Sequence, residues 1–337
     1  MDKKIRIGVV GCGGIATSHH IPSLRKIDDV ELVAVADIDK SRALLTASKF
    51  HVSRVYTDHA EMLKNEVLDV VDICTSIKTH AGIAADAMER GLHVLVEKPL
   101  AVSKSECNSL IGISRRMNVK LITLHTHGFV PSVRKAKALI DNGIIGSPIL
   151  ARFTAQYFSY PKDWWAWILW ELGPHRVYNG MYYLGDVHEV KVNCINQNIP
   201  PDFEVILFCK KGIVLIHWIL SGGTYSYEEI LGTKGSISVT TYNKPILRKS
   251  FETNYGELKY HLNMLQNMAR TGIAYLLRGK RLSPHYILLK ESINCIKNDS
   301  SPPVDPERAS RVVEVIEEIE TQLNGQVSAR LEFSHSG

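Results

Sequence analysis

The sequence contains 337 residues, of which 45% are hydrophobic and 22% are charged. These fractions lie close to the averages of globular proteins and exclude collagen-like and intrinsically disordered classes. The 40 basic and 35 acidic residues leave a net charge of +5 without a basic stripe or tract, and the isoelectric point near 8.7 lies below the range typical of nucleic-acid-binding domains, so we expect no nucleic-acid partner.

Short apolar runs alternate with segments of helical period through the first 125 residues. The runs predict strands at 5–10, 31–36, 68–74, 93–96 and 120–124, and the segments between them predict helices at 39–50, 79–90 and 103–116. Such alternation is typical of an α/β fold in which helices cover both faces of a doubly wound parallel sheet. We assign residues 1–125 to this domain.

The pattern changes after residue 125. A helix is predicted at 133–142, and the following apolar runs predict strands at 148–157, 188–196, 203–209, 213–220, 227–231 and 236–241. Because glycine-containing turns separate several of these runs, we expect a largely antiparallel sheet with one open face. Helices are predicted again at 258–271, 284–297 and 306–323. Residues 126–325 are therefore assigned to a second, α+β domain, and residues 326–337 to a frayed tail.

Six cysteines are scattered along the chain without a C-x-x-C pair or a histidine at zinc-finger spacing, so we expect no metal site. Several lie within apolar runs, where reduced cysteine behaves as a small hydrophobe, and this favours a cytoplasmic protein. The run 5–10 is short and broken by glycine, which is typical of a strand and not of a secretion signal. The apolar segment 164–172 is shorter than the roughly 20 residues that span a bilayer, so no membrane association is expected.

A glycine-rich turn connects the first predicted strand to the next helix. Its G-x-G-x-x-A pattern consists of Gly11, Cys12, Gly13, Gly14, Ile15 and Ala16. In this context the glycines permit a tight turn and let a pyrophosphate approach the helix N-terminus, so all six residues are candidate cofactor-binding residues. Asp37 follows the second strand, 21 residues after Ala16, where an acidic side chain would bind an adenosine ribose. The pattern predicts NAD, while the nearby Lys40 and Arg42 leave NADP as a second cofactor.

Two other interpretations fit the same residues. In the first, the glycines form a turn only, and Asp37 caps the helix that begins near Asp39. In the second, the loop binds S-adenosylmethionine, which is a weaker competitor because its glycine loops lack the motifs described next.

Two further motifs carry a resemblance to a known family. Glu97-Lys98-Pro99 closes the fifth predicted strand, and Glu171-Leu172-Gly173-Pro174-His175 is expected to open a helix in the second domain. With the glycine turn, they resemble the glucose-fructose oxidoreductase and inositol dehydrogenase (Gfo/Idh/MocA) family, from residue 5 to about residue 323. Thr75 and His80 also match the family's pattern around the fourth strand. The resemblance implies cofactor contacts for Thr75, His80, Glu97 and Lys98.

The resemblance also implies an N-terminal Rossmann domain and a hydride transfer between NAD or NADP and a small-molecule substrate. The hydride would move to or from a hydroxyl or keto carbon of a sugar, sugar derivative or cyclitol. Lys98 would lie near the nicotinamide and the substrate hydroxyl. His175 corresponds to the family's proton acceptor, and Glu171 to the acid four positions earlier. Lys98, His175 and Glu171 are therefore the candidate catalytic residues.

The residue types suit these roles. Oxidation of an alcohol by hydride transfer requires removal of the hydroxyl proton, for which histidine is well suited. Gly173 and Pro174 predict the N-cap and first residue of a helix, which would place His175 in its first turn, where the helix dipole disfavours a protonated imidazole. Lys98 could stabilise a developing alkoxide, and Glu171 could orient either group. A surface or capping histidine and a solvated lysine are the alternative interpretations.

The chain departs from the family at two positions. Gly128 stands where the family often has arginine before Phe-x-Pro, and Tyr178, with Asn179 beside it, stands where aspartate is common three residues after the histidine. His125 and His127 either reach the pocket in place of the arginine or are satisfied polar residues beneath the cofactor. His125, His127, Tyr178 and Asn179 are therefore candidate substrate contacts.

Four of the five tryptophans lie between residues 164 and 170. They could form an aromatic wall against a sugar, with Trp164 and Trp165 as candidate substrate contacts, or they could pack at an interface or in the core. An open sheet face needs a cover, and in this family another subunit commonly provides it. We therefore expect a homodimer or homotetramer formed through the C-terminal sheet.

Three other functions are compatible with these motifs. They are an NAD-using glycosidase that transiently oxidises its sugar, an imine or enone reductase, and a non-catalytic dinucleotide-sensing regulator. The last is disfavoured by Lys98 and His175, because a sensor needs no proton-transfer pair. The leading prediction is an NAD(P)-dependent dehydrogenase that acts on CH–OH groups.

Overall fold

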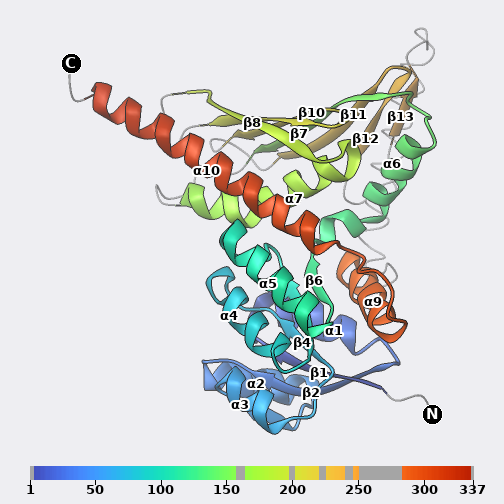
Figure 1. Ribbon diagram of the computed structural model, residues 1–337. Coiled ribbons are helices and arrows are strands. Elements are labelled where there is room, and N and C mark those ends of the chain that lie inside the picture. Colours follow the sequence, from blue (N-terminus) through green and yellow to red (C-terminus); the bar gives the residue numbers. More distant parts are fainter. Residues whose placement is uncertain are drawn as a thin grey trace. The chain divides into compact units, whose positions relative to one another are not determined.

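The computed structural model describes residues 4–156, 164–196, 202–219, 225–239, 246–249 and 283–334, with side chains described except at 164–167, 225, 246–249 and 327–334. The chain divides into two compact units (Figure 1). The first unit contains Met1–Thr126 and Leu282–Glu314, and the second contains His127–Arg281 and Val315–Gly337.

The first unit is built on a six-stranded parallel sheet in the order β3-β2-β1-β4-β5-β6. Its strands are β1 (Ile5–Val10), β2 (Val30–Ala36), β3 (Arg54–Tyr56), β4 (Val70–Ile73), β5 (His93–Glu97) and β6 (Leu121–Leu124). Valine, leucine and isoleucine dominate these strands and are mostly buried, as in sheets that are covered on both faces. The strand order reverses between β1 and β4, and ligands of such sheets bind at this switch point.

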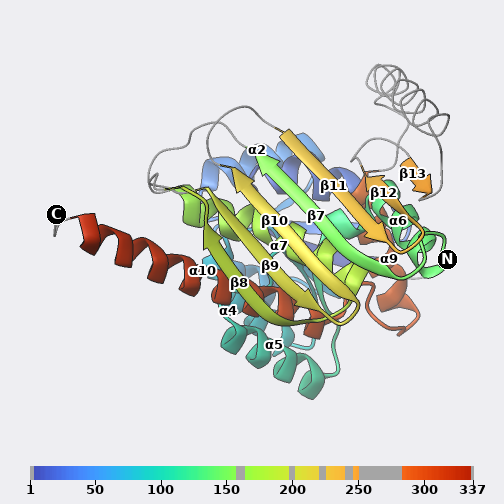
Figure 2. The same cartoon turned by 90° about the horizontal axis from the view of Figure 1, so that it is seen from above.

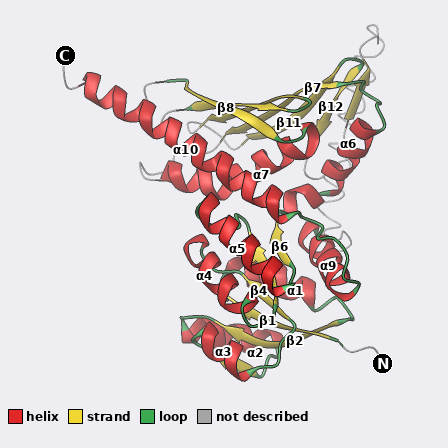
Figure 3. Cartoon of the chain, in the orientation of Figure 1, coloured by secondary structure: helices red, strands yellow, loops and turns green. Residues whose placement is uncertain are grey.

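Helices lie on either side of these strands (Figure 3). They are the π-helical turn η1 (Ala16–His20), α1 (Ile21–Leu24), α2 (Lys40–Phe50), α3 (His59–Asn65), α4 (Ile77–Met88), α5 (Lys104–Met117) and α9 (Pro284–Lys297). The side chains of Asp39, Asp58 and Ser103 accept backbone N–H groups at the starts of α2, α3 and α5. His51 and Asn118, in the left-handed conformation, end α2 and α5.

The five strands and three helices predicted for the first 125 residues are confirmed, with ends that differ by at most two residues. β3 and α3 were not predicted. β3 is only three residues long, too short to show an alternating pattern. α3 buries only Met62 and Leu63, so its sequence carries little helical period.

One part of the first unit comes from the far end of the sequence. α9 and the beginning of α10 (Pro306–Ser334) belong to this unit, so it includes a segment that a contiguous boundary at residue 125 leaves out. α9 packs against α1 and β6. Ion pairs from Lys104 to Glu314 and from Arg115 to Glu307 join α5 to the beginning of α10.

The second unit is built on a seven-stranded sheet in the order β13-β12-β11-β7-β10-β9-β8. Its strands are β7 (Pro148–Gln156), β8 (Val187–Cys194), β9 (Phe203–Cys209), β10 (Gly212–Ile219), β11 (Tyr225–Gly232), β12 (Gly235–Val239) and β13 (Ile246–Lys249). All neighbouring pairs are antiparallel except β7 and β10, because the last strand of the β8–β9–β10 meander lies beside β7. The predicted largely antiparallel sheet is confirmed, and β13 adds a strand that was not predicted.

Side chains along β7, β9 and β10 alternate between buried and half-exposed. The buried face packs on helix α7 (Trp164–Leu184): a Cβ atom at Gly180 of α7 would lie 2.8 Å from the Val214 side chain of β10. The other face carries half-exposed apolar side chains such as Ile206 and Leu215. Figure 2 looks onto this face, and no described helix crosses in front of its strands.

Helix α7 corrects one prediction about the second unit. It runs from Trp164 to Leu184 with Pro174 inside it, so Gly173 and Pro174 do not begin a helix and His175 does not lie in a first turn. Gly173 serves packing instead, because a Cβ atom there would lie 2.8 Å from Ile316 of α10. Apolar side chains are buried on both sides of Pro174, and this packing outweighs the local helix-start signal.

The remaining elements are η2 (Thr126–Phe129), α6 (Pro131–Asp141) and the end of α10. α10 continues to Ser334, so the tail predicted to be frayed from residue 326 is helical up to that point. The predicted helix at 258–271 lies outside the described residues. Among the described helices, none combines the length and the apolar character needed to cross a membrane.

Candidate active site

The glycine turn leaves open space where a ligand backbone can approach. Gly11 has φ +92°, and a Cβ atom there would lie 2.6 Å from the carbonyl oxygen of Cys74, so only glycine fits between β1 and β4. Gly13 and Gly14 have no atom within 4 Å of a Cβ position. The helical run that follows contains η1 and α1. This turn fits the pyrophosphate of a dinucleotide, because the described residues leave the space beside Gly13 and Gly14 open.

The carboxylate of Asp37 is held in place at the end of β2. One oxygen accepts the Cys12 N–H and the other accepts the Asp39 N–H, each at 2.8 Å. Asp39, not Asp37, caps α2 by accepting the Arg42 N–H, which excludes the capping interpretation of Asp37. The Arg42 guanidinium lies 3.8 Å from Asp37. The Asp37 carboxylate is therefore fixed as an acceptor, and its remaining lone pairs suit hydrogen bonds from the hydroxyl groups of a ribose.

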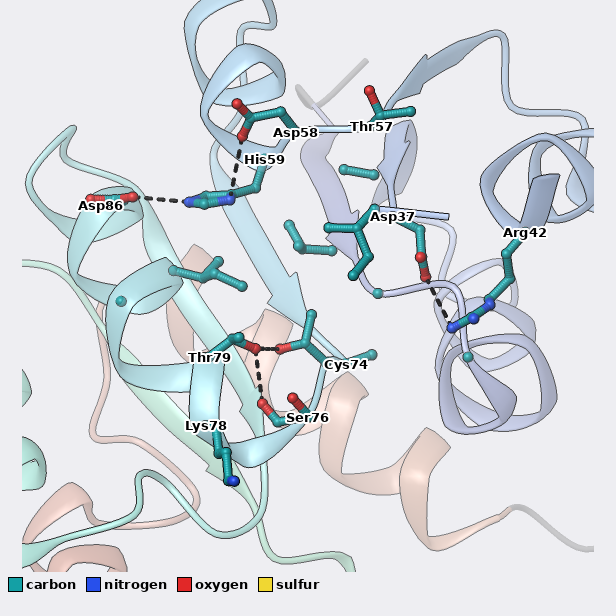
Figure 4. Close-up of a pocket in the computed structure, with 18 residues that line it drawn as sticks. Asp37, Arg42, Thr57, Asp58, His59, Cys74, Ser76, Lys78, Thr79 and Asp86 are labelled. Atoms are coloured by element: carbon teal, nitrogen blue, oxygen red, sulfur yellow. Dashed lines mark hydrogen bonds and ion pairs between the residues drawn. The ribbon is translucent and has the colours of Figure 1, made fainter. Parts of the chain in front are cut away.

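A cleft of about 800 Å³ extends from the glycine turn past Asp37 (Figure 4). Thr75, which follows β4, lines this cleft, and the Thr79 hydroxyl donates to the Thr75 hydroxyl at 2.9 Å. The far wall contains His59, whose Nε2 lies 2.9 Å from Asp86. Sequence reasoning missed His59 and Asp86, because His59 belongs to the unpredicted α3 and Asp86, in the last turn of α4, is part of no motif.

His80 contacts the backbone of Thr75, one of the residues that line this cleft. It is buried, and its Nδ1 lies 2.9 Å from the Pro99 carbonyl oxygen and its Nε2 3.2 Å from the Thr75 carbonyl oxygen. Burial lowers the pKa of His80, which favours the neutral ring with a single N–H. The shorter contact assigns that N–H to Nδ1. His80 therefore connects the segment after β4 to the segment after β5.

Glu97 and Lys98 occupy the end of β5, as predicted. Glu97 is buried, with Oε1 2.8 Å from His20 Nε2, while Oε2 accepts the Lys98 N–H at 3.1 Å. Burial by itself would raise the pKa of Glu97, but the hydrogen bond and the positive charge of His20 outweigh it and lower that pKa to about 2. The Lys98 side chain is half-exposed. His20 was not singled out in the sequence, because no spacing links it to Glu97.

Glu171 and His175 lie four residues apart in α7 and therefore on the same face of that helix. Both are half-buried. The His175 ring stacks on the His127 ring, with centroids 3.8 Å apart and planes 15° from parallel. His127 is thus in direct contact with His175, the predicted proton acceptor, and this contact favours the interpretation that His127 reaches the pocket. Lys98 lies in the first unit, whereas these three residues lie in the second.

The two departures from the family pattern touch each other. A Cβ atom at Gly128 would lie 2.5 Å from Cε1 of Tyr178, so the tyrosine ring occupies the space in which a larger residue at 128 would begin. Tyr178 is buried and stacks on Tyr182, with centroids 6.2 Å apart. The two positions at which the chain departs from the expected pattern are therefore in direct contact.

The other predicted substrate contacts lie in different surroundings. Asn179 is buried beside Glu228, whose pKa is raised by burial and whose partners include the Tyr183 hydroxyl and the Arg176 guanidinium. This network joins α7 to β11. His125 is buried at the end of β6, in the first unit. The side chains of Trp164 and Trp165 lie outside the described residues.

Comparison with known proteins gives two family matches. A model of the oxidoreductase family with an NAD-binding Rossmann fold (GFO_IDH_MocA) matches residues 5–125. A model of the same family's C-terminal alpha/beta domain matches residues 137–326. Together the two matches cover both compact units.

Similar proteins and structures agree with these matches. Oxidoreductase P35 of Formosa agariphila is 25% identical over 271 residues, which are 73% of this chain and 82% of that protein. Myo-inositol 2-dehydrogenase of Thermotoga maritima is 32% identical over 152 residues, about 45% of each chain. The crystal structure of the WlbA dehydrogenase from Bordetella pertussis, in complex with NADH and UDP-GlcNAcA, superposes with a TM-score of 0.79 at 18% identity over 97% of both chains, which shows the same fold.

Proposed function

The chain belongs to the Gfo/Idh/MocA oxidoreductase family, and from this premise we propose that it is a dehydrogenase of CH–OH groups in a sugar, sugar derivative or cyclitol. It is an NAD(P)-dependent oxidoreductase, and its cofactor is NAD. The substrate class is supported by the polyol and sugar-nucleotide chemistry named for similar proteins.

One observation carries the proposal: four groups line up along one edge of the first sheet. The glycine turn follows β1, Asp37 follows β2, Thr75 follows β4 and Lys98 follows β5. These strands are neighbours in the parallel sheet, in the order β2-β1-β4-β5, so the four groups share its carboxyl edge. A dinucleotide bound along this edge has its ribose at Asp37 and its reactive end toward Lys98.

The residues divide the work of alcohol oxidation. Bound NAD supplies a hydride acceptor. His175 is assigned the removal of the hydroxyl proton, and the Lys98 ammonium is assigned the stabilisation of negative charge that develops on the substrate during oxidation. Glu171, one helical turn before His175, orients the imidazole. Because His175 is not at a helix start, its orientation depends on packing, and the parallel stack on His127 fixes the plane of its ring.

The protein is further proposed to act as a cytoplasmic homodimer or homotetramer. The six cysteines are free, and five of them are buried, which suits a reducing compartment. The half-exposed apolar face of the second sheet supplies the surface for a second copy of the chain.

A substrate panel tests the proposed activity. Myo-inositol, scyllo-inositol, aldoses, sugar phosphates and UDP-linked uronic acids are each incubated with NAD or NADP, and net NADH or NADPH formation is followed by absorbance. We expect stoichiometric reduction of NAD with at least one polyol or sugar. Glycoside hydrolysis without net NADH would indicate the glycosidase instead. Cofactor binding without turnover of any CH–OH or carbonyl compound would indicate the regulator.

A further inference from the structure

A buried polar cluster lies beneath the carboxyl edge of the first sheet, and the mechanism above does not use it. It consists of His20 at the end of η1, Asp72 and Cys74 from β4 and the residue after it, Glu97 at the end of β5, and His285 in α9. All five belong to the first unit. His20 and Asp72 are fully buried, and polar groups so placed need a structural or functional reason.

His20 is clamped between two carboxylates. Its Nδ1 lies 3.1 Å and 3.0 Å from the two oxygens of Asp72, and its Nε2 lies 2.8 Å from Oε1 of Glu97. Carboxylates accept hydrogen bonds, so both ring nitrogens must carry a proton for both contacts to form. Burial by itself would lower the pKa of His20, but the Asp72 carboxylate outweighs it and raises that pKa well above 6.5. His20 is therefore an imidazolium ion inside the fold.

The other neighbours of His20 are neutral. Burial raises the pKa of the Cys74 thiol to about 12, with Asp72 adding to the effect. The His285 ring lies 5.7 Å from the His20 ring, and burial together with the His20 charge lowers the pKa of His285 to about 4. The cluster thus contains two carboxylates and one cation, and the charge of His20 offsets one of the two negative charges.

The distances favour direct hydrogen bonds over a bound metal ion. Zinc holds nitrogen and oxygen ligands at about 2.0–2.2 Å in a tetrahedron, which separates neighbouring ligand atoms by roughly 3.3 Å. The contact of His20 with Glu97 is shorter, at 2.8 Å, and His20 Nδ1 lies 3.1 Å from Cys74 Sγ. A second proton on the His20 ring explains its contacts with Asp72 and Glu97 without a metal ion.

The clamp reaches Lys98 through Glu97. Oε1 of Glu97 is bound by His20, and Oε2 accepts the backbone N–H of Lys98 at 3.1 Å. On the other side of Lys98, the Pro99 carbonyl oxygen lies 2.9 Å from His80 Nδ1. The backbone that carries the Lys98 side chain is therefore held from both sides by buried histidines.

We propose that His20 is a positioning residue for Lys98: the buried imidazolium fixes Glu97, and Glu97 fixes the backbone from which the Lys98 ammonium is presented. The inference rests on the proposed function in assigning Lys98 to the substrate oxygen. The positioning itself is a property of the first unit and is measurable without any substrate.

The test replaces His20 with glutamine and measures Lys98 directly. NAD-loaded protein is treated briefly with acetic anhydride at several pH values, and acetylation of Lys98 relative to Lys104 is quantified by mass spectrometry. In His20→Gln we expect Lys98 to react several-fold faster than in the wild type, because its backbone is released. With an active substrate from the panel, kcat should fall by roughly 10- to 100-fold with a smaller change in KM. Unchanged labelling of Lys98 in folded His20→Gln overturns the proposal, whatever the panel yields.

His93→Gln is the matched control. His93 is a half-buried histidine at the opposite end of β5, where its Nδ1 accepts the Lys120 N–H at 2.9 Å. We expect this variant to lose thermal stability while Lys98 labelling stays at the wild-type level. An equal labelling change in His93→Gln would mean that general loosening of the sheet, and not the clamp, governs Lys98.

Two measurements keep the test decisive if His20→Gln does not fold. The double variant His20→Gln with Asp72→Asn removes the uncompensated carboxylate and should show the same faster labelling of Lys98. In wild-type protein with ¹⁵N-labelled histidine, one buried ring should remain doubly protonated at pH 8. A spectrum in which every histidine is neutral at that pH, or a stoichiometric metal ion in the purified wild type, overturns the proposal.

Discussion

At the scale of single residues, Asp37 is the side chain that we expect to set the preference between NAD and NADP. The sequence offers two acidic side chains after β2, and the structure gives them different tasks. Asp39 caps α2, whereas Asp37 is aimed at the cleft by two backbone N–H donors. A carboxylate fixed in this way accepts hydrogen bonds from ribose hydroxyls and repels a 2′-phosphate. Among the described residues, the only ion pair of Asp37 is with the neighbouring Arg42.

Replacing Asp37 with serine should therefore shift the preference toward NADP. We expect the ratio of the dissociation constants for NAD and NADP to rise by roughly 10-fold or more, because a charged hydrogen bond is worth about 1.5–3 kcal/mol. The ratio is measured by titration with both cofactors. Asp39→Ser is the control, since serine can still cap α2, and it should leave the ratio unchanged. An unchanged ratio in Asp37→Ser would mean that the adenosine end is recognised elsewhere.

Lys98 and His175 carry the proposed chemistry, one from each compact unit. Lys98→Ala and His175→Ala should each lower turnover by roughly 100-fold or more, because each removes a group to which we assign charge stabilisation or proton transfer. NADH binding, measured by fluorescence, should persist in both variants. The exposed residues Lys104 and His188 provide matched alanine controls with near-normal turnover. Near-normal turnover in both test variants would refute the assigned roles.

At the scale of elements, helix α7 carries both residues that pack against its neighbours and the proposed catalytic residues of the second unit. Gly173 and Gly180 let the helix approach α10 and β10 closely, while Glu171 and His175 lie on a common face one turn apart. Local rules for Gly-Pro predict a helix start here, and they fail because burial on both sides of Pro174 outweighs them. Glu171 and His175 are consequently held within a long helix that is packed on both sides of Pro174.

The contact between η2 and α7 yields a prediction about stability. Gly128→Ala should lower the free energy of unfolding by about 1–3 kcal/mol, because the new Cβ atom would lie 2.5 Å from the Tyr178 ring. Urea denaturation measures this loss. Adding Tyr178→Ala should recover part of it in a double-mutant cycle. Gly112→Ala in α5, with open space around the new Cβ atom, is the control and should not destabilise. Additive effects of Gly128→Ala and Tyr178→Ala would contradict the coupling.

At the scale of the whole molecule, the second sheet leaves one face to be covered. Its inner face is filled by α7, whereas Ile206 and Leu215 on the other face stay half-exposed (Figure 2). Apolar side chains gathered on one face of a sheet are typical of a surface that pairs with another subunit. The described part of the chain offers no helix for this purpose.

Leu215→Lys should therefore weaken self-association. A buried lysine at the centre of the face would lose its hydration, so the oligomer should dissociate toward the 37.8 kDa monomer. Size-exclusion chromatography with light scattering measures the mass. Leu45→Lys, on an exposed position of α2 in the first unit, should leave the mass unchanged. A wild type that is monomeric at micromolar concentration would show that the face is not a dimer interface.

The amino-acid sequence by itself determined the features that depend on neighbouring residues. Apolar runs that alternate with helical segments predicted the positions of β1, β2, β4, β5 and β6 in the chain. The glycine turn and Asp37 predicted a dinucleotide cofactor. The largely antiparallel sheet of the second unit followed from successive apolar runs and the glycine-containing turns between them. These features could be predicted because backbone geometry and side-chain period are local properties.

Only the tertiary structure decided which distant residues meet. In the structure α9 belongs to the first unit, and α7 continues through Pro174. Tyr178 contacts Gly128, and His20 contacts both Asp72 and Glu97. Residues 20, 72 and 97 have no common spacing, because their proximity comes from neighbouring strands and a helix packed on the same sheet edge. Burial and charge compensation act between such residues, and no local pattern in the chain records them.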